Sequence, residues 1–148
     1  MVDSWAPVEI ELIAQLPPTD KPAESLRYYT PPNVRPSPAF SRVALVRSER
    51  QVFISGLSAR AAGDGEAQAR DVFAQLKSIL ATAGGDMLHL AKATYYVSDD
   101  DASNALDKAR SEFFNPERPP AASKVMVHAV GRLGRTFTMD MIAVDCAQ

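Results

Sequence analysis

The sequence contains very little cysteine and histidine. Cys146 is the single cysteine among 148 residues, and His89 and His128 are the only histidines. One cysteine cannot form an internal disulfide and suits a reducing compartment, so we expect a cytoplasmic protein. We expect no metal site either, because no cluster of cysteines and histidines has metal-ligand spacing.

Long apolar runs and a strong charge of one sign are also absent. No apolar run approaches the roughly 20 residues that cross a bilayer, and no secretory signal pattern is visible at the N-terminus. The net charge of −2 gives no global attraction to nucleic acid or to an anionic membrane. The second half is mildly basic but lacks a basic stripe interleaved with aromatics. We therefore expect neither nucleic acid nor membrane as a partner.

Proline, in contrast, is concentrated near the N-terminus. Eight of the 11 prolines precede residue 39, and this density excludes a continuous helix or a central strand over residues 17–38. We interpret that stretch as an extended connection. Upstream of it, acidic and aliphatic residues alternate over residues 8–14, which predicts a strand.

From residue 40 onward the pattern is that of one compact domain. Periodicity predicts two helices, one from Asp64 or Glu66 to Ala83 and one over residues 101–114. Strands are predicted over residues 42–46, 51–55, 88–97, 124–130 and 136–144. This β-β-α-β-α-β-β order favours an α+β fold in which both helices pack on one face of a single mixed sheet.

Short segments in order along the chain resemble one known family. They cover residues 38–41, 52–56, 83–86, 92–99, 112–114, 119–123 and 138–143. The sequence resembles the YjgF-like family, also called the reactive intermediate deaminase (RidA) or endoribonuclease L-PSP family. The resemblance implies a chorismate-mutase-like fold, a homotrimer with pockets between subunits, and hydrolysis of enamines and imines without metal or cofactor.

The residues that the resemblance associates with deamination are missing. The family's carboxylate-binding arginine corresponds to Ala122, its last-strand glutamate to Thr138, and its tyrosine to Phe40. Lys124 replaces a small residue or cysteine, and Asp107 corresponds to an asparagine. Because alanine, threonine and phenylalanine cannot supply a bidentate clamp, a base near neutral pH or a phenolic hydroxyl, we expect a divergent member without the usual deaminase activity.

We therefore expect a homotrimer that binds a small metabolite, anions included, in a cleft between subunits. Lys124, Arg110 and Ser123 could hold an anion there, or Lys124 could point to solvent or pair with an acid across the trimer interface. The expected cleft residues are Phe40, Ser41, Arg110, Ala122, Ser123, Lys124 and Thr138.

Two alternatives stay open. One is residual imine or enamine hydrolysis that uses Lys124 or Arg110, so that the protein would be a cofactor-independent hydrolase. The other is a purely structural role as the assembly domain of a tandem protein. RNA cleavage is disfavoured, because no acid–base pair for it is visible.

The N-terminal region suggests the tandem arrangement. We divide the chain into an extension, residues 1–37, and a YjgF-like domain, residues 38–148. Residues 9–14 align without gaps to residues 138–143. Our hypothesis is that residues 1–16 descend from the last strand of a preceding domain of the same type. The alternative is that any edge strand alternates acidic and aliphatic residues.

Overall fold

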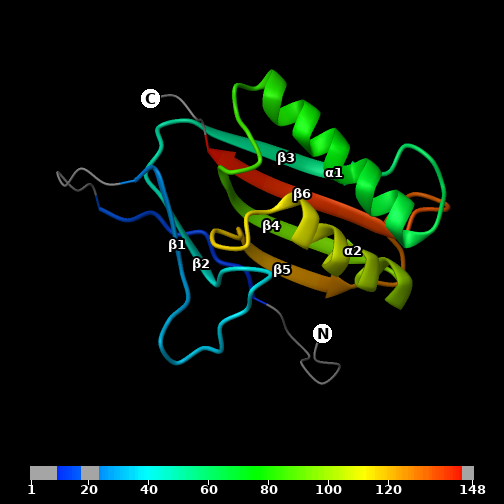
Figure 1. The fold of residues 1–148 in the computed structure, drawn as a ribbon, viewed down its shortest axis with the longest axis horizontal. Helices are drawn as coiled ribbons and strands as arrows, with labels where there is room; N and C mark the ends of the chain where they lie inside the picture. Colours follow the sequence, from blue (N-terminus) through cyan, green and yellow to red (C-terminus); the bar gives the residue numbers. More distant parts are fainter. Residues whose placement is uncertain (1–9, 18–23, 145–148) are drawn as a thin grey trace.

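The structure is a computed structural model that describes residues 10–17 and 24–144. Two helices and six strands follow one another in the order β1 (Leu26–Tyr29), β2 (Val43–Val46), β3 (Gln51–Ser58), α1 (Gly65–Thr82), β4 (Leu90–Val97), α2 (Asp100–Phe113), β5 (Ala121–Met126) and β6 (Phe137–Val144) (Figure 1). Neither helix is long and apolar enough to cross a membrane.

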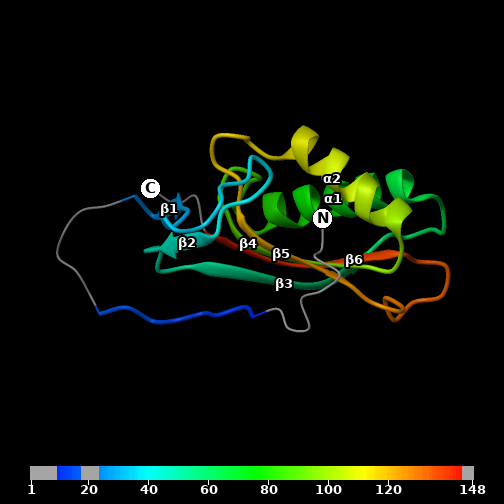
Figure 2. The ribbon, with the colours of Figure 1, turned by 90° about the horizontal axis from the view of Figure 1, so that it is seen from below.

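Four strands form the main sheet, in the order β3-β6-β4-β5. The strands β4 and β5 run parallel, whereas β6 is antiparallel to both β3 and β4, so the sheet is mixed. Both helices cover the same face of this sheet and leave the other face without a helix (Figure 2). The predicted α+β class, with two helices on one face, is confirmed. We call the opposite surface the open face.

Both helices begin at the aspartates that the sequence places there. The Asp64 side chain accepts a hydrogen bond from the backbone N–H of Ala67, and Asp99 accepts one from that of Ala102, each at 2.8 Å. Such caps satisfy backbone donors that the first helical turn leaves unpaired. The helix α1 ends before Gly84, whose φ of 81° belongs to the left-handed region that favours glycine.

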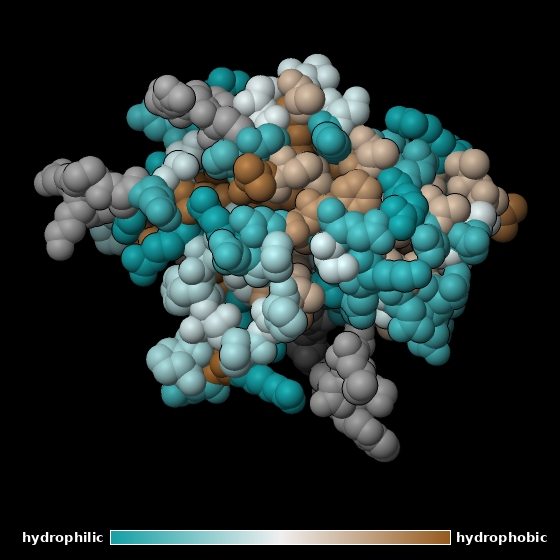
Figure 3. All heavy atoms as spheres, in the orientation of Figure 1, coloured by the Kyte–Doolittle hydropathy of each residue, from teal (hydrophilic) through white to brown (hydrophobic). Residues whose placement is uncertain are grey.

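The core lies between the helices and the sheet. Phe73 of α1 is fully buried, stacks on Phe113 with ring centroids 5.0 Å apart, and meets Phe114 edge-on at 5.3 Å. The fully buried Tyr95 and Phe137 belong to the strands of the sheet and pack in the same core, with their ring centroids 6.3 Å apart. On the outer surface of the helical side, hydrophilic side chains predominate and apolar ones show mainly along the middle (Figure 3).

Strand β2 departs from the predicted single sheet. It pairs antiparallel with β1 in a separate two-stranded sheet. No strand was predicted over Leu26–Tyr29, because prolines precede and follow this stretch. The strand is compatible with them because it is an edge strand of only four residues and ends before Pro31. Two side chains hold it to the domain: the Tyr28 hydroxyl donates to the carbonyl of Leu90, and Arg118 donates to that of Leu26 at 3.1 Å.

Two strand predictions need correction. Strand β5 covers Ala121–Met126 rather than residues 124–130, because it pairs with β4 from Ala121 onward, directly after two prolines. Residues 10–14 of the predicted N-terminal strand form no strand, and residues 8–9 lie outside the described residues. The segment of residues 10–17 instead lies along the open face (Figure 2). The division into residues 1–37 and 38–148, and the tandem origin, stay predictions.

Candidate functional site

Three of the predicted cleft residues gather where the edge strand β5 begins. Ser41 forms an isolated parallel bridge with Ala121. Its hydroxyl donates to the carbonyl of Pro119 at 2.8 Å, and it is 8% exposed. Phe40 precedes it in the chain and Ala122 follows the bridge. Phe40, Ser41 and Ala122 are therefore close together, and the cleft between subunits that the resemblance implies for them stays a prediction.

Lys124 lies two residues further along β5 and points to the helical side of the sheet. Its ammonium donates to the Ser103 hydroxyl at 2.9 Å and to the two carboxylate oxygens of Asp107 at 3.0 and 2.9 Å. Only 10% of the Lys124 side chain is exposed. Lys124 therefore pairs with an acid of its own chain, and its N–H groups point at acceptors already present.

Arg110 joins the same carboxylate from one turn further along α2. Its guanidinium donates to Asp107 and lies 5.4 Å from the ring centre of Tyr95. The Arg110 side chain is 6% exposed. Its Nε and the Tyr95 hydroxyl are buried without a hydrogen-bond partner among the described residues. We call Ser103, Asp107, Arg110 and Lys124 the Asp107 cluster.

Asp107 is the only carboxylate in this cluster. Its partial burial alone would raise the pKa of the carboxyl. The hydrogen bond from Lys124, together with the positive charges of Arg110 and Lys124, outweighs burial, so the pKa of Asp107 lies below its usual value. Two cations and one anion leave a net charge of +1 in the cluster, beside the position of Ala122.

The structure separates the other two predicted residues from this cluster. Ser123 pairs with Thr94 across the sheet, whereas Lys124 pairs with Tyr95. Successive side chains of a strand point to opposite faces, so Ser123 lies on the open face and Lys124 on the helical face. Thr138 lies on the open face too, and its hydroxyl donates to the carbonyl of Leu57 at 2.9 Å. Ser123 thus does not share a face with Lys124 and Arg110.

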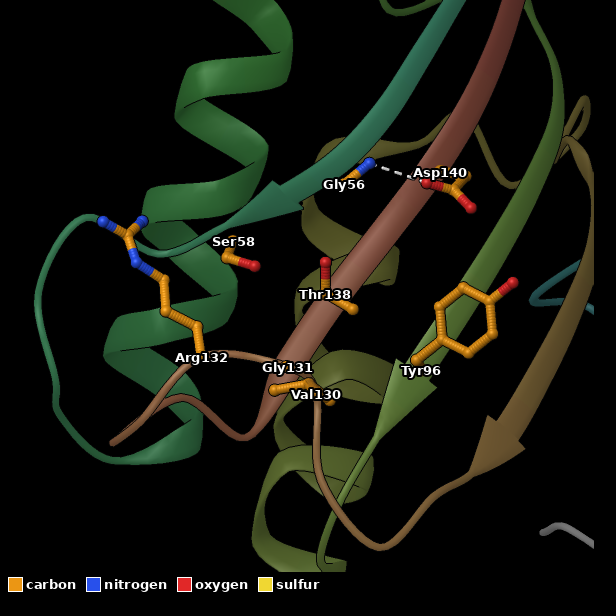
Figure 4. A pocket seen from close by; sticks show the side chains of 8 residues that line it. All are labelled: Gly56, Ser58, Tyr96, Val130, Gly131, Arg132, Thr138 and Asp140. Carbon is orange, nitrogen blue, oxygen red and sulfur yellow. Dashed lines mark hydrogen bonds between the residues drawn. The ribbon is translucent and has the colours of Figure 1, made fainter.

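A surface pocket of about 520 Å³ surrounds Thr138 on the open face. It is lined by Gly56, Ser58, Tyr96, Val130, Gly131, Arg132, Thr138 and Asp140 (Figure 4). The Ser58 hydroxyl points toward β6, whereas the guanidinium of Arg132 points away from Tyr96 and Asp140 at the rim. The lining is mostly polar, so the pocket suits a small polar ligand more than an apolar one.

Asp140 and Tyr96 are the pocket residues with the most chemistry, and sequence reasoning missed both. One Asp140 oxygen accepts hydrogen bonds from the Gly56 N–H at 2.7 Å and the Ser55 hydroxyl at 3.2 Å. Burial raises the pKa of Tyr96, and the negative charges of Asp140 and Glu11 raise it further. The alternation of β4, with Tyr95 buried, was a signal that could have placed Tyr96 on the opposite face.

The comparisons with known proteins establish the family. The model of the endoribonuclease L-PSP family matches residues 32–145, which is most of the chain, so this protein belongs to that family. It is 30% identical over 113 residues to protein DfrA of Myxococcus xanthus, covering 72% of this chain and 85% of DfrA.

Solved structures of the same family share the fold. The Rid-family protein YyfB of Yersinia pestis is 25% identical, has a TM-score of 0.72, and covers 82% of this chain and 99% of its own. NMB1025 of Neisseria meningitidis, a YjgF-family protein, is 22% identical with a TM-score of 0.62 over 83% of this chain and 97% of its own. These likenesses confirm the predicted YjgF-like membership and the chorismate-mutase-like fold.

The described residues therefore hold two polar sites on opposite faces of one sheet. The Asp107 cluster lies at the edge strand next to Phe40, Ser41 and Ala122, and the open-face pocket contains Thr138. No group of three or more metal-ligating side chains occurs within residues 10–17 and 24–144. The chemistry that the two sites offer is hydrogen bonding and charge.

Proposed function

We propose that this protein binds a small polar metabolite in a cleft between the subunits of a homotrimer, and that it lacks the imine deaminase activity usual in its family. The observation that carries the proposal is the Asp107 cluster beside Ala122. The clamp arginine is replaced by alanine, and the two nearby cations are held by a carboxylate of their own chain.

The charge of the cluster supports an anionic ligand. Its net charge of +1 is partly shielded from water, since the side chains of Lys124 and Arg110 are 10% and 6% exposed. Partial burial strengthens an electrostatic attraction relative to an exposed site. A lysine in this position acts as a point charge and not as the bidentate fork that fixes a carboxylate for reaction.

The same contacts argue against a lysine nucleophile. A Schiff base requires a free amine lone pair on Lys124. The Lys124 nitrogen instead donates to Ser103 and to both oxygens of Asp107. Together with phenylalanine at position 40 and threonine at position 138, this arrangement leaves no evident base or clamp for imine hydrolysis.

Both sites lie open at the surface of a single chain, and this supports subunit association. The open-face pocket is a hollow on the surface of one chain. Among the described residues, β5 pairs on one side with β4 and on the other side only with Ser41, at Ala121. An edge strand has backbone groups on one side that a second chain can cover. A neighbouring subunit placed there would close the cleft next to Ala122 and Lys124.

Binding and turnover measurements test the proposal. We expect the trimer mass by light scattering, no hydrolysis of 2-aminoacrylate-type imines above background, and binding of pyruvate as a small carboxylate probe by calorimetry. Lys124→Ala should weaken pyruvate binding about tenfold or more, because the retained charges then sum to zero. The matched control Lys77→Ala removes an exposed lysine of α1 and should leave binding unchanged.

Other outcomes would assign the protein differently. Imine turnover that Lys124→Ala abolishes would favour the deaminase alternative. A stable trimer that binds no small carboxylate would favour a purely structural role.

A further inference from the structure

The N-terminal segment lies along the open face and touches it through one side chain (Figure 2). The Glu11 carboxylate accepts hydrogen bonds from the Lys92 ammonium at 2.7 Å and from the Thr94 hydroxyl at 2.6 Å. Among the described residues, nothing else in the segment of residues 10–17 forms a hydrogen bond or ion pair with the sheet. The place of the segment on the sheet therefore depends on this one carboxylate.

The apolar side chains of the segment add little to its attachment. Ile10, Leu12, Ile13 and Leu16 are 60–83% exposed. Because these side chains stay in water, burial of apolar surface does not hold the segment against the sheet. An ion pair that is partly open to water is a weak attachment by itself. The segment can therefore leave the sheet at modest cost.

The contact of Glu11 with Lys92 is nevertheless well defined. The Lys92 side chain is 18% exposed, and its ammonium also contacts the carbonyl of Ala93 at 2.7 Å and the Thr94 hydroxyl at 3.2 Å. Partial burial raises the pKa of Glu11, but the hydrogen bonds from Lys92 and Thr94 and the Lys92 charge outweigh it and lower the pKa overall. The contact is therefore an ionised pair near neutral pH.

Lys92 lies in the same cross-strand row as the most exposed aromatic ring of the open face. Phe53 of β3 pairs with Ile142 of β6, and Ile142 pairs with Lys92 of β4. We call these three residues the Phe53 row. Neighbouring strands lie about 4.8 Å apart, so the row is short from Phe53 to Lys92. A subunit that covers the 67% exposed Phe53 buries on the order of 800 Å² of this chain, a patch wide enough to include Lys92.

The segment and a neighbouring subunit exclude one another at the Phe53 row. Two sheet faces pack about 10 Å apart, with their side chains in direct contact. An extended segment between them adds a further layer of backbone and side chains, which holds the second surface away from Phe53. A neighbour that contacts the ring of Phe53 therefore requires the segment to move off Lys92.

We propose that residues 10–17 form a displaceable strap over the open face and that Glu11 is its latch. The closed strap keeps a second copy of this chain from the Phe53 row, and the opened strap leaves the row to that copy. The strap thereby sets the chain concentration at which subunits associate. The inference rests on the subunit association of the proposed function and is independent of its ligand.

The concentration dependence of self-association tests the latch in the full-length chain. Glu11→Gln removes the charge that Lys92 holds, and Glu11→Lys replaces the attraction by repulsion. Sedimentation over a dilution series should show association of Glu11→Gln at about a two- to fivefold lower concentration than the parent protein, because the strap is open in more of the chains. Glu11→Lys should shift the midpoint further. The matched control Glu49→Gln, an exposed carboxylate in the turn between β2 and β3, should change nothing.

A zero-length cross-link reports the position of the strap directly. A carbodiimide condenses a carboxylate with an ammonium group in contact with it, with loss of water, and the Glu11–Lys92 pair at 2.7 Å meets this condition. Mass spectrometry of a mixture of ordinary and isotope-labelled chains distinguishes links within one chain from links between chains. The Glu11–Lys92 link should form within single chains of the monomer fraction and be missing from the associated fraction.

Several results would overturn the strap. A link within the chain that forms equally well in the associated fraction would show that segment and neighbour coexist. Association of Glu11→Gln that is weaker than that of the parent protein would place the segment inside the interface, and an unchanged midpoint in both Glu11 variants would leave it without a role. If the parent protein and both variants stay monomeric at every concentration, the proposed subunit association itself fails, and the strap with it.

Discussion

At the scale of single residues, Asp107 is the counter-ion of two cations, Lys124 and Arg110. Removing its charge leaves Lys124 and Arg110 close together without a counter-ion. We expect Asp107→Asn to lower the free energy of unfolding by about 1–2 kcal/mol, less than the 3–5 kcal/mol of fully buried pairs, because Asp107 is 42% exposed. Urea denaturation at pH 7 measures this, with Glu49→Gln as the control. A loss no larger than that of the control would contradict it.

The same pair of proteins should show a pH dependence of defined sign. The folded-state pKa of Asp107 lies below its usual value of 3.8. Such a group stabilises the fold above the unfolded pKa, and this stabilisation is lost as the pH falls through the folded pKa. The stability difference between the parent protein and Asp107→Asn should therefore be constant from pH 7 to about 5 and shrink below about 4. A difference that grows toward acid would be the opposite result.

Contacts between individual side chains were predicted less well from the sequence than any other feature. Family resemblance predicted Phe40, Ser41 and Ala122 in one cleft between subunits; the structure brings them near one another in one chain, and the cleft stays a prediction. The resemblance did not predict that Lys124 pairs with Asp107, since that contact depends on the rotation of α2 over β5. The contact of Glu11 with Lys92 was equally hidden, because it joins two segments about 80 residues apart without secondary structure in one of them.

At the scale of elements, the helices α1 and α2 come close together at Gly65. A Cβ at this position would lie 2.9 Å from the Ala102 backbone and 2.8 Å from a carboxylate oxygen of Asp101. We expect Gly65→Ala to destabilise the protein by about 1–3 kcal/mol, because α2 must move away from α1. Thermal unfolding measures it.

The matched control for that substitution is Gly63→Ala. Its added Cβ would meet only the Ala67 side chain, at 3.4 Å, which is an ordinary contact distance. Gly63→Ala should therefore change stability by a few tenths of a kcal/mol in either direction. Equal losses in the two variants would show that the helix contact is not the cause.

The helices were the elements best predicted from the sequence. Capping aspartates, an apolar stripe and a glycine stop all act locally, so their ends can be located without knowing the fold. Strands depend on their partners. Ala121–Ser123 has small side chains with little strand preference, yet β4 pairs with it. Residues 8–14 have the alternation of a strand, yet the described part, residues 10–14, pairs with none.

At the scale of the whole molecule, the open face carries apolar surface that a neighbouring subunit can cover. Phe53 of β3 is 67% exposed there. We expect Phe53→Ser to weaken self-association about tenfold or more, because an aromatic ring buried in an interface contributes strongly to affinity. Sedimentation at a series of concentrations measures it. Leu133→Ser is the control, since Leu133 is 99% exposed on a loop; an equal effect of both would argue against this face.

The α+β class and the single-sided helices were predictable because the order of elements restricts the possible arrangements. The pairing of β2 with β1 in a second sheet was not predictable, because β1 itself, a strand within the proline-rich region, was not predicted. Local patterns therefore predicted the layers of the molecule but not which edges pair.

The position of β6 has a consequence for how the protein is made. This strand is the last described element along the chain, yet it lies between β3 and β4 in the sheet. A ribosome synthesises β3 and β4 long before it reaches residues 137–144, so both strands leave the exit tunnel with the edges that will face β6 unpaired. Unpaired strand edges are prone to aggregation. The sheet closes only once Val144 has emerged, so these two strand edges stay open to wrong pairings until the last strand is available.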